Sequence, residues 1–173
     1  MMINSQRSVR VSIAPLKRFL AEACELLRVP TESVTVSLVT NSMMARWNLQ
    51  YRAKPAPTDV LSFAAGAETR RTINRAGRRS TPRIRSRRPG KASPQRHAVS
   101  GEDGPYLASY LGDVAIAPAV ARQNARELGR TLDDEMKILI LHGLLHLLGY
   151  DHETDHGQME RRERRLRRSL GLT

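Results

Sequence analysis

The segment HGLLHLLGYDH at residues 142–152 carries three histidines, His142, His146 and His152. Residues four apart on a helix lie one above the other on the same face, so the first two imidazoles can point to one place. Gly149 can end that helix through a left-handed turn, after which the chain can bring the third histidine back. Three neutral imidazoles and an open fourth position are the ligand set of a catalytic zinc ion. The spacing therefore predicts a site for one Zn²⁺ ion.

The alternative is that these histidines are ordinary core residues. The run from Met136 to Leu148 is apolar apart from Lys137 and two histidines, which predicts a central, buried helix. A lone histidine in such a helix is usually hydrogen-bonded in the core, but two at helical spacing, followed by a glycine and a third, favour metal binding. Burial also disfavours the imidazolium and keeps the ligand form available. The single cysteine, Cys24, excludes a closed thiolate site.

The residue after the first histidine separates two chemistries. Metzincin proteases carry H-E-x-x-H-x-x-G-x-x-H, in which the glutamate is the general base. This chain has the same histidine and glycine positions, but Gly143 replaces the glutamate. Glu153 and Asp155 lie nearby in sequence, and nothing in the sequence indicates that they point toward the metal. A metallopeptidase is therefore disfavoured, whereas a metal-dependent hydrolase that needs no glutamate there is not.

Two further motifs precede the histidine segment, TDVLSF at 58–63 and LGDVAIAP at 111–118. In this order the three motifs resemble the YbeY endoribonuclease family of metal-dependent hydrolases, from about residue 34 to residue 170 with one long insertion. The resemblance implies a zinc-dependent, single-strand-specific endoribonuclease that acts in 16S rRNA 3′-end maturation and ribosome quality control. It also implies rRNA and the small ribosomal subunit as partners.

The resemblance assigns roles to individual residues. The zinc ligands of the family correspond to His142, His146 and His152, and its active-site arginine corresponds to Arg52, in the stretch NLQYRAKPAPTDVLSF. A guanidinium is a planar, two-pronged donor that suits phosphate, so this arginine would stabilise charge on the non-bridging oxygens. The chain has many other arginines, and only the position before TDVLSF singles this one out. A competing hypothesis is a non-catalytic RNA- or ribosome-binding factor in which zinc stabilises the fold.

Other polar residues near the motifs have two interpretations each. Thr58, Asp59 and Ser62 can line the cleft or orient a histidine, or Asp59 can cap a backbone turn. Asp151 can accept a hydrogen bond from a ligand imidazole or serve a turn. We expect His156 to be a surface histidine rather than a fourth ligand.

Length and composition predict one domain spanning residues 1–173. No stretch approaches the ~18–20 consecutive apolar residues of a membrane span. No secretory signal is visible at the N-terminus, and one cysteine provides no disulfide framework. We therefore expect a cytoplasmic protein without a membrane partner. The oligomeric state is left open.

The formal net charge of +12 is unevenly distributed. Between residues 69 and 98 the chain has ten arginines, one lysine and no acidic residue, with many Ser, Thr, Pro and Gly. Such a segment cannot bury enough apolar surface to offset its ordering entropy, so we expect a disordered, arginine-rich insertion at about 66–104. It can add sequence-independent phosphate contacts to RNA. Alternatively, it reflects a general bias toward arginine, because the whole chain has few lysines.

The periodicity of apolar residues predicts a mixture of strands and helices. The expected fold is α+β, a single domain with a four-stranded mixed sheet, helices packed on it and the metal-binding helix most deeply buried. On the helix 41–51, we expect Met43, Met44, Trp47 and Leu49 to pack in the core. The predicted strands are 7–13, 33–40, 58–64 and 110–117, and the predicted helices are 15–27, 41–51, 118–129, a metal-bearing helix capped by Thr131 and Asp134, and 157–170.

Overall fold

The computed structural model describes residues 1–65, 110–152 and 154–172. The predicted arginine-rich insertion, at about 66–104, lies outside the described residues. The elements are β1 (Met2–Asn4), α1 (Ile13–Leu27), a 3-10 turn (Thr31–Ser33), β2 (Val34–Leu38), α2 (Asn41–Arg52), β3 (Val60–Ala64), β4 (Gly112–Ile116), α4 (Pro118–Glu127), α5 (Leu132–Leu147) and α6 (Gln158–Ser169).

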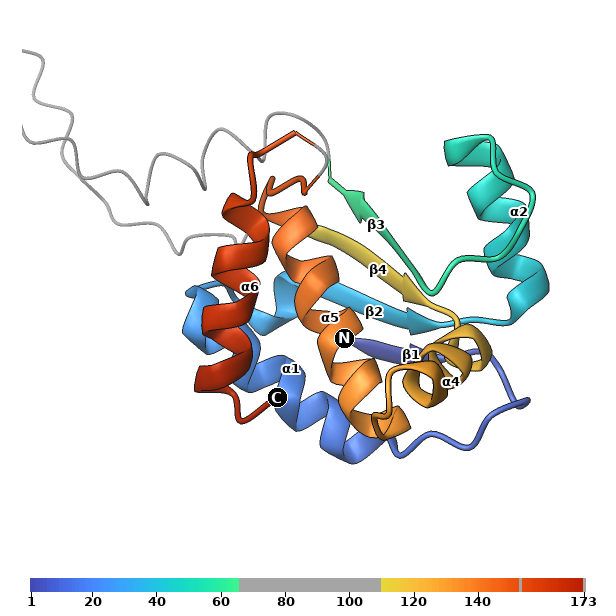
Figure 1. Ribbon diagram of the computed structural model, residues 1–173, viewed down its shortest axis with the longest axis horizontal. Helices are drawn as coiled ribbons and strands as arrows, with labels where there is room; N and C mark the ends of the chain where they lie inside the picture. The colour runs from blue at the N-terminus through green and yellow to red at the C-terminus, as the bar shows by residue number, and fades with distance from the viewer. Residues whose placement is uncertain (66–109, 153, 173) are drawn as a thin grey trace, which may run out of the picture.

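The four strands form one sheet in the order β1-β2-β4-β3 (Figure 1). β1, β2 and β4 run parallel to one another, and β3 pairs antiparallel with β4 and occupies one edge. In the register of that last pair, Ser62 lies opposite Val114. The predicted α+β fold with a four-stranded mixed sheet is confirmed.

The predicted strand at residues 7–13 is wrong. The first strand is Met2–Asn4, and α1 already begins at Ile13. Gln6 explains the difference, because its side chain donates to the Val9 carbonyl and accepts from the Val9 amide, both at 3.0 Å. These bonds hold the chain in a turn and occupy backbone groups that a strand ladder would need. Val9 is still buried, so the alternating pattern reflects packing rather than a strand.

The helix that carries the first two histidines, α5, lies at the centre of the molecule. It contacts α1, α4, α6 and the strands β3 and β4 (Figure 1). Its apolar side chains are almost completely buried, and they belong to the main core cluster together with side chains of α1 and the sheet. The prediction of a central, buried metal-bearing helix is therefore confirmed for its packing.

The other face of the sheet has a smaller cluster under α2, with Met44 at its centre. Trp47 packs against this cluster while remaining half-buried. Met43 and Leu49 were expected to pack as well, but they are 41% and 56% exposed. The reason is that α2 covers only part of this face, so a single stripe of the helix, one side chain every three or four residues, reaches the sheet.

Among the described helices, none is both long and apolar enough to span a bilayer.

Candidate metal centre

Local sequence signals define both ends of α5. At the start, the Thr131 hydroxyl accepts a hydrogen bond from the Asp134 amide at 3.1 Å, which confirms the predicted cap. At the end, Gly149 has φ +90°, and the Tyr150 amide donates to the Leu145 carbonyl at 3.1 Å. This pattern is a Schellman motif, which needs a left-handed residue at the position of the glycine. The turn reverses the chain and leads it back over the histidine face.

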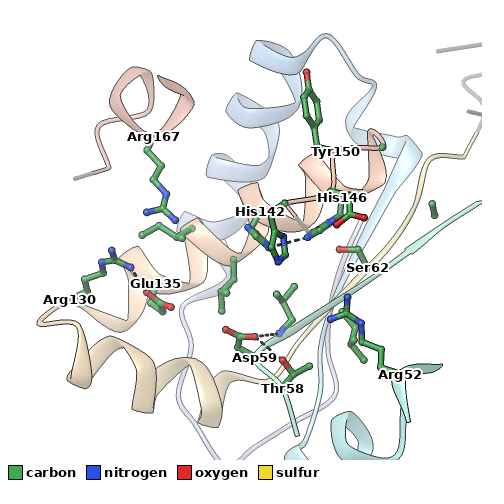
Figure 2. A pocket seen from close by; sticks show the side chains of 18 residues that line it. Arg52, Thr58, Asp59, Ser62, Arg130, Glu135, His142, His146, Tyr150 and Arg167 are labelled. Carbon is green, nitrogen blue, oxygen red and sulfur yellow. Dashed lines mark hydrogen bonds and ion pairs between the residues drawn. The ribbon is translucent and has the colours of Figure 1, made fainter. Parts of the chain in front are cut away.

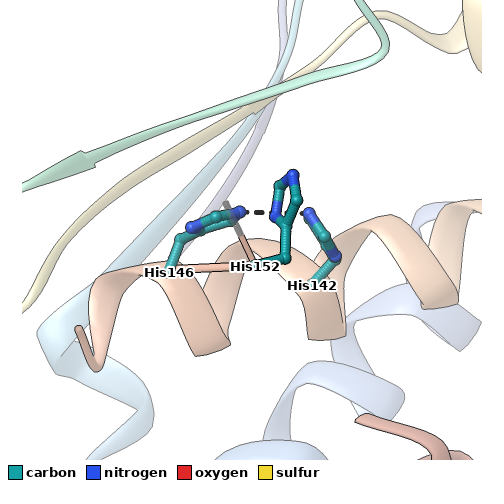
Figure 3. A group of neighbouring side chains, drawn as sticks. All are labelled: His142, His146 and His152. Carbon is teal, nitrogen blue, oxygen red and sulfur yellow. Dashed lines mark hydrogen bonds between the residues drawn. The ribbon is translucent and has the colours of Figure 1, made fainter. Parts of the chain in front are cut away.

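The three histidines meet at one place (Figure 3). The Nε2 atoms of His142 and His146 are 3.1 Å apart, and one ligand nitrogen from each of the three rings lies within 4.8 Å of the others. The first two side chains are half-buried and that of His152 is exposed. The structure therefore brings together all three histidines that the sequence singles out, with one side of the group open to solvent.

The donor set fits a single metal ion. In a tetrahedral site with bonds of about 2.0–2.1 Å, two imidazole nitrogens lie roughly 3.3–3.4 Å apart. The 3.1 Å between the two Nε2 atoms is close to this separation. Two nitrogen lone pairs that face each other at such a distance need a proton or a cation between them. Among the described residues, no fourth His, Cys or carboxylate joins the three imidazoles, which matches a site that keeps an open position.

The electrostatics favour the ligand form of the rings. Burial lowers the pKa of His146 below its usual value, and the neighbouring His142 and His152 lower it further. A lowered pKa keeps the imidazole neutral at neutral pH, with a lone pair available for a metal.

A buried carboxylate, that of Glu163, orients the ring of His142. His142 Nδ1 lies 2.9 Å from Glu163 Oε2, on α6, and Arg167 pairs with the other carboxylate oxygen. Burial alone would raise the pKa of Glu163, but the hydrogen bond with His142 and the charge of Arg167 outweigh it and hold the pKa below its usual value. The carboxylate is therefore ionised, so the Nδ1–H of His142 donates to it and Nε2 keeps its lone pair.

Glu163 was not among the residues predicted from the sequence. It lies in a strongly charged helix, where an acid four residues before an arginine indicates a solvent-exposed ion pair. Only 8% of the residue is exposed, because α6 packs against α5. The available signal was the spacing of Met159, Glu163 and Leu166, which places the glutamate on the apolar side of α6.

The histidines lie in a cleft of about 610 Å³ (Figure 2). Arg52, the last residue of α2, lines one end of the same cleft, and Arg130 and Arg167 line the other end. The chain turns sharply after Arg52, since Ala53 is left-handed with φ 55°, and the buried Asn48 amide donates to the Ala56 carbonyl at 2.7 Å. These contacts hold the end of α2 at the cleft.

The TDVLSF motif lines the cleft and also serves the backbone, but none of its printed hydrogen bonds reaches a histidine. Thr58, Asp59 and Ser62 line the cleft. Asp59 also has a structural role, because Oδ1 accepts from the Val60 amide at 2.8 Å and Oδ2 from the Asn124 side chain at 3.0 Å. The Ser62 hydroxyl donates to the Gly143 carbonyl at 3.3 Å, which joins β3 to α5.

The acidic residues after α5 have different surroundings. Asp151 lines the cleft, and its Oδ2 accepts a hydrogen bond from the Thr154 hydroxyl at 3.1 Å. Asp155 accepts from three amides at the start of α6, including Met159 at 2.6 Å, so it serves as a helix cap. Glu153 lies outside the described residues. His156 is exposed and outside the histidine group, as expected.

Gly143 explains why a metzincin-like glutamate is missing. A Cβ at this position would lie 2.5 Å from Val114 Cγ1 and 3.2 Å from Ser62 Oγ, so α5 can approach β4 only without a side chain there. A glutamate at this position would collide with Val114 at its first side-chain atom.

We therefore expect Gly143→Ala to destabilise the protein by about 1–3 kcal/mol, through overpacking against β4. Denaturant unfolding of Gly143→Ala, Val114→Ala and the double variant measures this. The double variant should be more stable than the sum of the single changes predicts, because the smaller residue 114 makes room for the new methyl group. Strict additivity would contradict the steric explanation.

Comparisons with known proteins agree with this architecture and with the motifs. The sequence model of the family Endoribonuclease YbeY matches residues 2–171 of this chain. Endoribonuclease YbeY of Leifsonia xyli is 32% identical over 151 residues, which cover 87% of this chain and 80% of that protein. Endoribonuclease YbeY of Koribacter versatilis is 34% identical over 172 residues, which cover 99% of this chain and 86% of that protein.

A solved structure shares the fold. The solution structure of a Thermotoga maritima protein superposes with a TM-score of 0.53 and 21% sequence identity, covering 98% of this chain and 89% of that one. At this identity the likeness concerns the arrangement of helices and strands.

Proposed function

This chain belongs to the Endoribonuclease YbeY family, as its three motifs predict, and we therefore propose that it is a metal-dependent endoribonuclease that cleaves single-stranded RNA. The observation that carries the proposal is the convergence of His142, His146 and His152 in a cleft that Arg52 also lines. A phosphodiester that enters the cleft meets a set of metal ligands and a guanidinium together. The hydrolase reaction adds water across the P–O bond.

The residues of the cleft have different roles in the proposed reaction. The three imidazoles would hold one ion, which we expect to be Zn²⁺, and a bound Zn²⁺ would supply Lewis-acid chemistry and an activated water. Glu163 fixes the tautomer and orientation of His142 through the 2.9 Å bond to Nδ1. Arg52 donates two parallel hydrogen bonds to non-bridging phosphate oxygens and stabilises their charge in the transition state.

The biological setting is also part of the proposal. We propose 16S rRNA 3′-end maturation and ribosome quality control as the processes, and rRNA in the small ribosomal subunit as the substrate. We propose a cytoplasmic location, which the single cysteine supports, because disulfide-rich composition is typical of secreted proteins. The basic surplus of the chain, a net charge of +12, supports binding to RNA.

Incubation of the purified protein with single-stranded and double-stranded rRNA fragments tests the proposal. We expect cleavage of the single-stranded fragment, loss of cleavage with a chelator, and recovery when Zn²⁺ is restored. Cleavage that persists with the chelator would contradict the metal-dependent reaction. Tight RNA binding without cleavage in the presence of Zn²⁺ would favour the non-catalytic binding factor instead.

The orienting role of Glu163 predicts a loss of metal affinity on substitution. Glu163→Gln keeps a hydrogen-bond acceptor for His142 but removes the charge that makes the imidazole a better ligand, so we expect Zn²⁺ to bind about 10–100-fold more weakly. Competition with a chromogenic chelator measures the affinity. Glu160→Gln is the matched control, because Glu160 pairs with Arg164 on the same helix and is exposed. Equal affinities of the two variants would contradict the role of Glu163.

A further inference from the structure

A second cavity, of about 270 Å³, lies on the opposite face of the sheet from the histidines. Ser62 contacts α5, so the next residue of the strand, Phe63, points to the other face. Val114 also faces α5, so its neighbour Asp113 points to the other face, like Phe63. We call this cavity the aromatic pocket, lined by Trp47, Tyr51, Phe63, Ser37 and Asp113.

The walls of the aromatic pocket are three aromatic rings. Trp47 and Tyr51 are four residues apart on α2 and so share a face. Their ring centroids lie 6.0 Å and 5.1 Å from that of Phe63, in edge-to-face geometry. The chain has two Phe, one Trp and four Tyr residues, so the three rings are a large share of its aromatic side chains. Tyr51 is 60% exposed, which indicates a ring available to a ligand rather than one that fills the core.

The aromatic pocket is also lined by a hydrogen-bond acceptor, the carboxylate of Asp113. Asp113 Oδ1 accepts a hydrogen bond from the Tyr110 hydroxyl at 2.6 Å. Burial and this bond raise the pKa of Tyr110, so the hydroxyl stays protonated and remains the donor. Among the described residues, no basic side chain forms an ion pair with Asp113. A carboxylate without a cation repels phosphate but accepts hydrogen bonds from N–H groups.

We propose that the aromatic pocket binds one unstacked nucleobase of the single-stranded RNA, a nucleotide that neighbours the phosphate at Arg52. This inference rests on the proposed function. Single-stranded nucleic acids are bound by stacking of bases on aromatic rings, beside hydrogen bonds to the base edges. A volume of about 270 Å³ is below the roughly 300–1,000 Å³ of pockets for drug-sized ligands, which suits a single base.

The aromatic pocket and the metal cleft are lined by neighbouring residues of two elements, α2 and β3. On α2, Tyr51 lines the pocket and Arg52 lines the cleft. On β3, Phe63 lines the pocket and Ser62 lines the cleft. Since β3 is an edge strand, a single strand of RNA can pass over its outer side and place a phosphate on one face of the sheet and a flanking base on the other.

The acceptor predicts a base preference. Adenine, guanine and cytosine carry an exocyclic amino group that can donate to Asp113, and glutamate and aspartate commonly accept from such groups. Uracil instead presents carbonyl oxygens on both sides of its N3–H, and these repel a carboxylate. We therefore expect uridine to bind most weakly at this position.

Two measurements on the full-length, zinc-loaded protein test the proposal. Trp47 is the sole tryptophan, so its fluorescence reports directly on the aromatic pocket. Mononucleotides contain no internal phosphodiester to cleave, and we expect AMP and CMP to quench the fluorescence more than UMP, and ribose 5-phosphate not at all. Asp113→Asn should reduce the preference over UMP.

In RNA cleavage, Tyr51→Ala should raise KM about tenfold, through the lost stacking, with little change in kcat or zinc content. Leu49→Ala is the matched control, because Leu49 is similarly exposed on α2 and lies outside the pocket. Unchanged Trp47 fluorescence with every mononucleotide, or equal KM values for the two variants, would overturn the base-binding proposal while RNA cleavage by the unaltered protein still stood. Equal quenching by ribose 5-phosphate would also overturn it, in favour of a phosphate site. If the unaltered protein cleaves no RNA, the proposed function itself fails.

Discussion

Replacing His146 with alanine is expected to abolish RNA cleavage and to reduce bound Zn²⁺ to background. The His146 Nε2 atom lies 3.1 Å from that of His142, so the substitution removes one of the two nitrogens that lie nearest each other in the group. The two remaining imidazoles leave an incomplete ligand set. The affinity for Zn²⁺ should therefore fall by more than the about 10–100-fold that the loss of an orienting partner costs. Elemental analysis of the purified variant and a cleavage assay on single-stranded rRNA measure the two effects.

His156→Ala provides the matched control for this substitution. His156 is an exposed histidine close in sequence to His152 but outside the histidine group. We expect this control to keep both Zn²⁺ and activity. A His146→Ala protein that still binds one Zn²⁺ per chain with unchanged affinity would show that the metal lies elsewhere. Unchanged cleavage by that variant would refute the role of the histidines in the reaction.

Replacing Arg52 with alanine is expected to lower kcat by about 10²–10³, the usual effect of losing one donor to a transition-state oxyanion. Arg52 lines the cleft but belongs to α2, which does not contribute a histidine. The substitution should therefore leave Zn²⁺ binding and the unfolding temperature unchanged. Single-turnover cleavage with saturating enzyme separates the rate of the chemical step from RNA affinity.

A matched arginine variant distinguishes a specific role of Arg52 from general charge. Arg46→Ala removes an exposed arginine from the same helix, outside the cleft. It should change the single-turnover rate little, since one of many surface cations contributes only to salt-dependent binding. Arg52→Lys should recover part of the rate, because a lysine supplies the charge without the two-pronged geometry. Equal rates for the Arg46 and Arg52 alanine variants would remove Arg52 from the active site.

The local signals in the sequence were reliable where neighbouring residues decide the conformation. Thr131 and Gly149 mark the ends of α5 through hydrogen bonds that span three to five residues. The strand prediction failed at residues 7–13 because Gln6 bonds to Val9 and creates a turn that alternating hydrophobicity does not reveal. The side chains of Met43 and Leu49 were misassigned because the sequence does not indicate how much of the sheet α2 covers.

The histidine set could be read from a short stretch of chain, since helical spacing and a glycine turn are local properties. The family motifs also drew attention to Arg52. That Glu163, 21 residues from His142, orients its ring from another helix follows only from how the chain folds. The same holds for Gly143, which has no room for a side chain against Val114. Such contacts depend on which helix packs on which face of the sheet, and that arrangement is set by burial of the whole core rather than by local sequence.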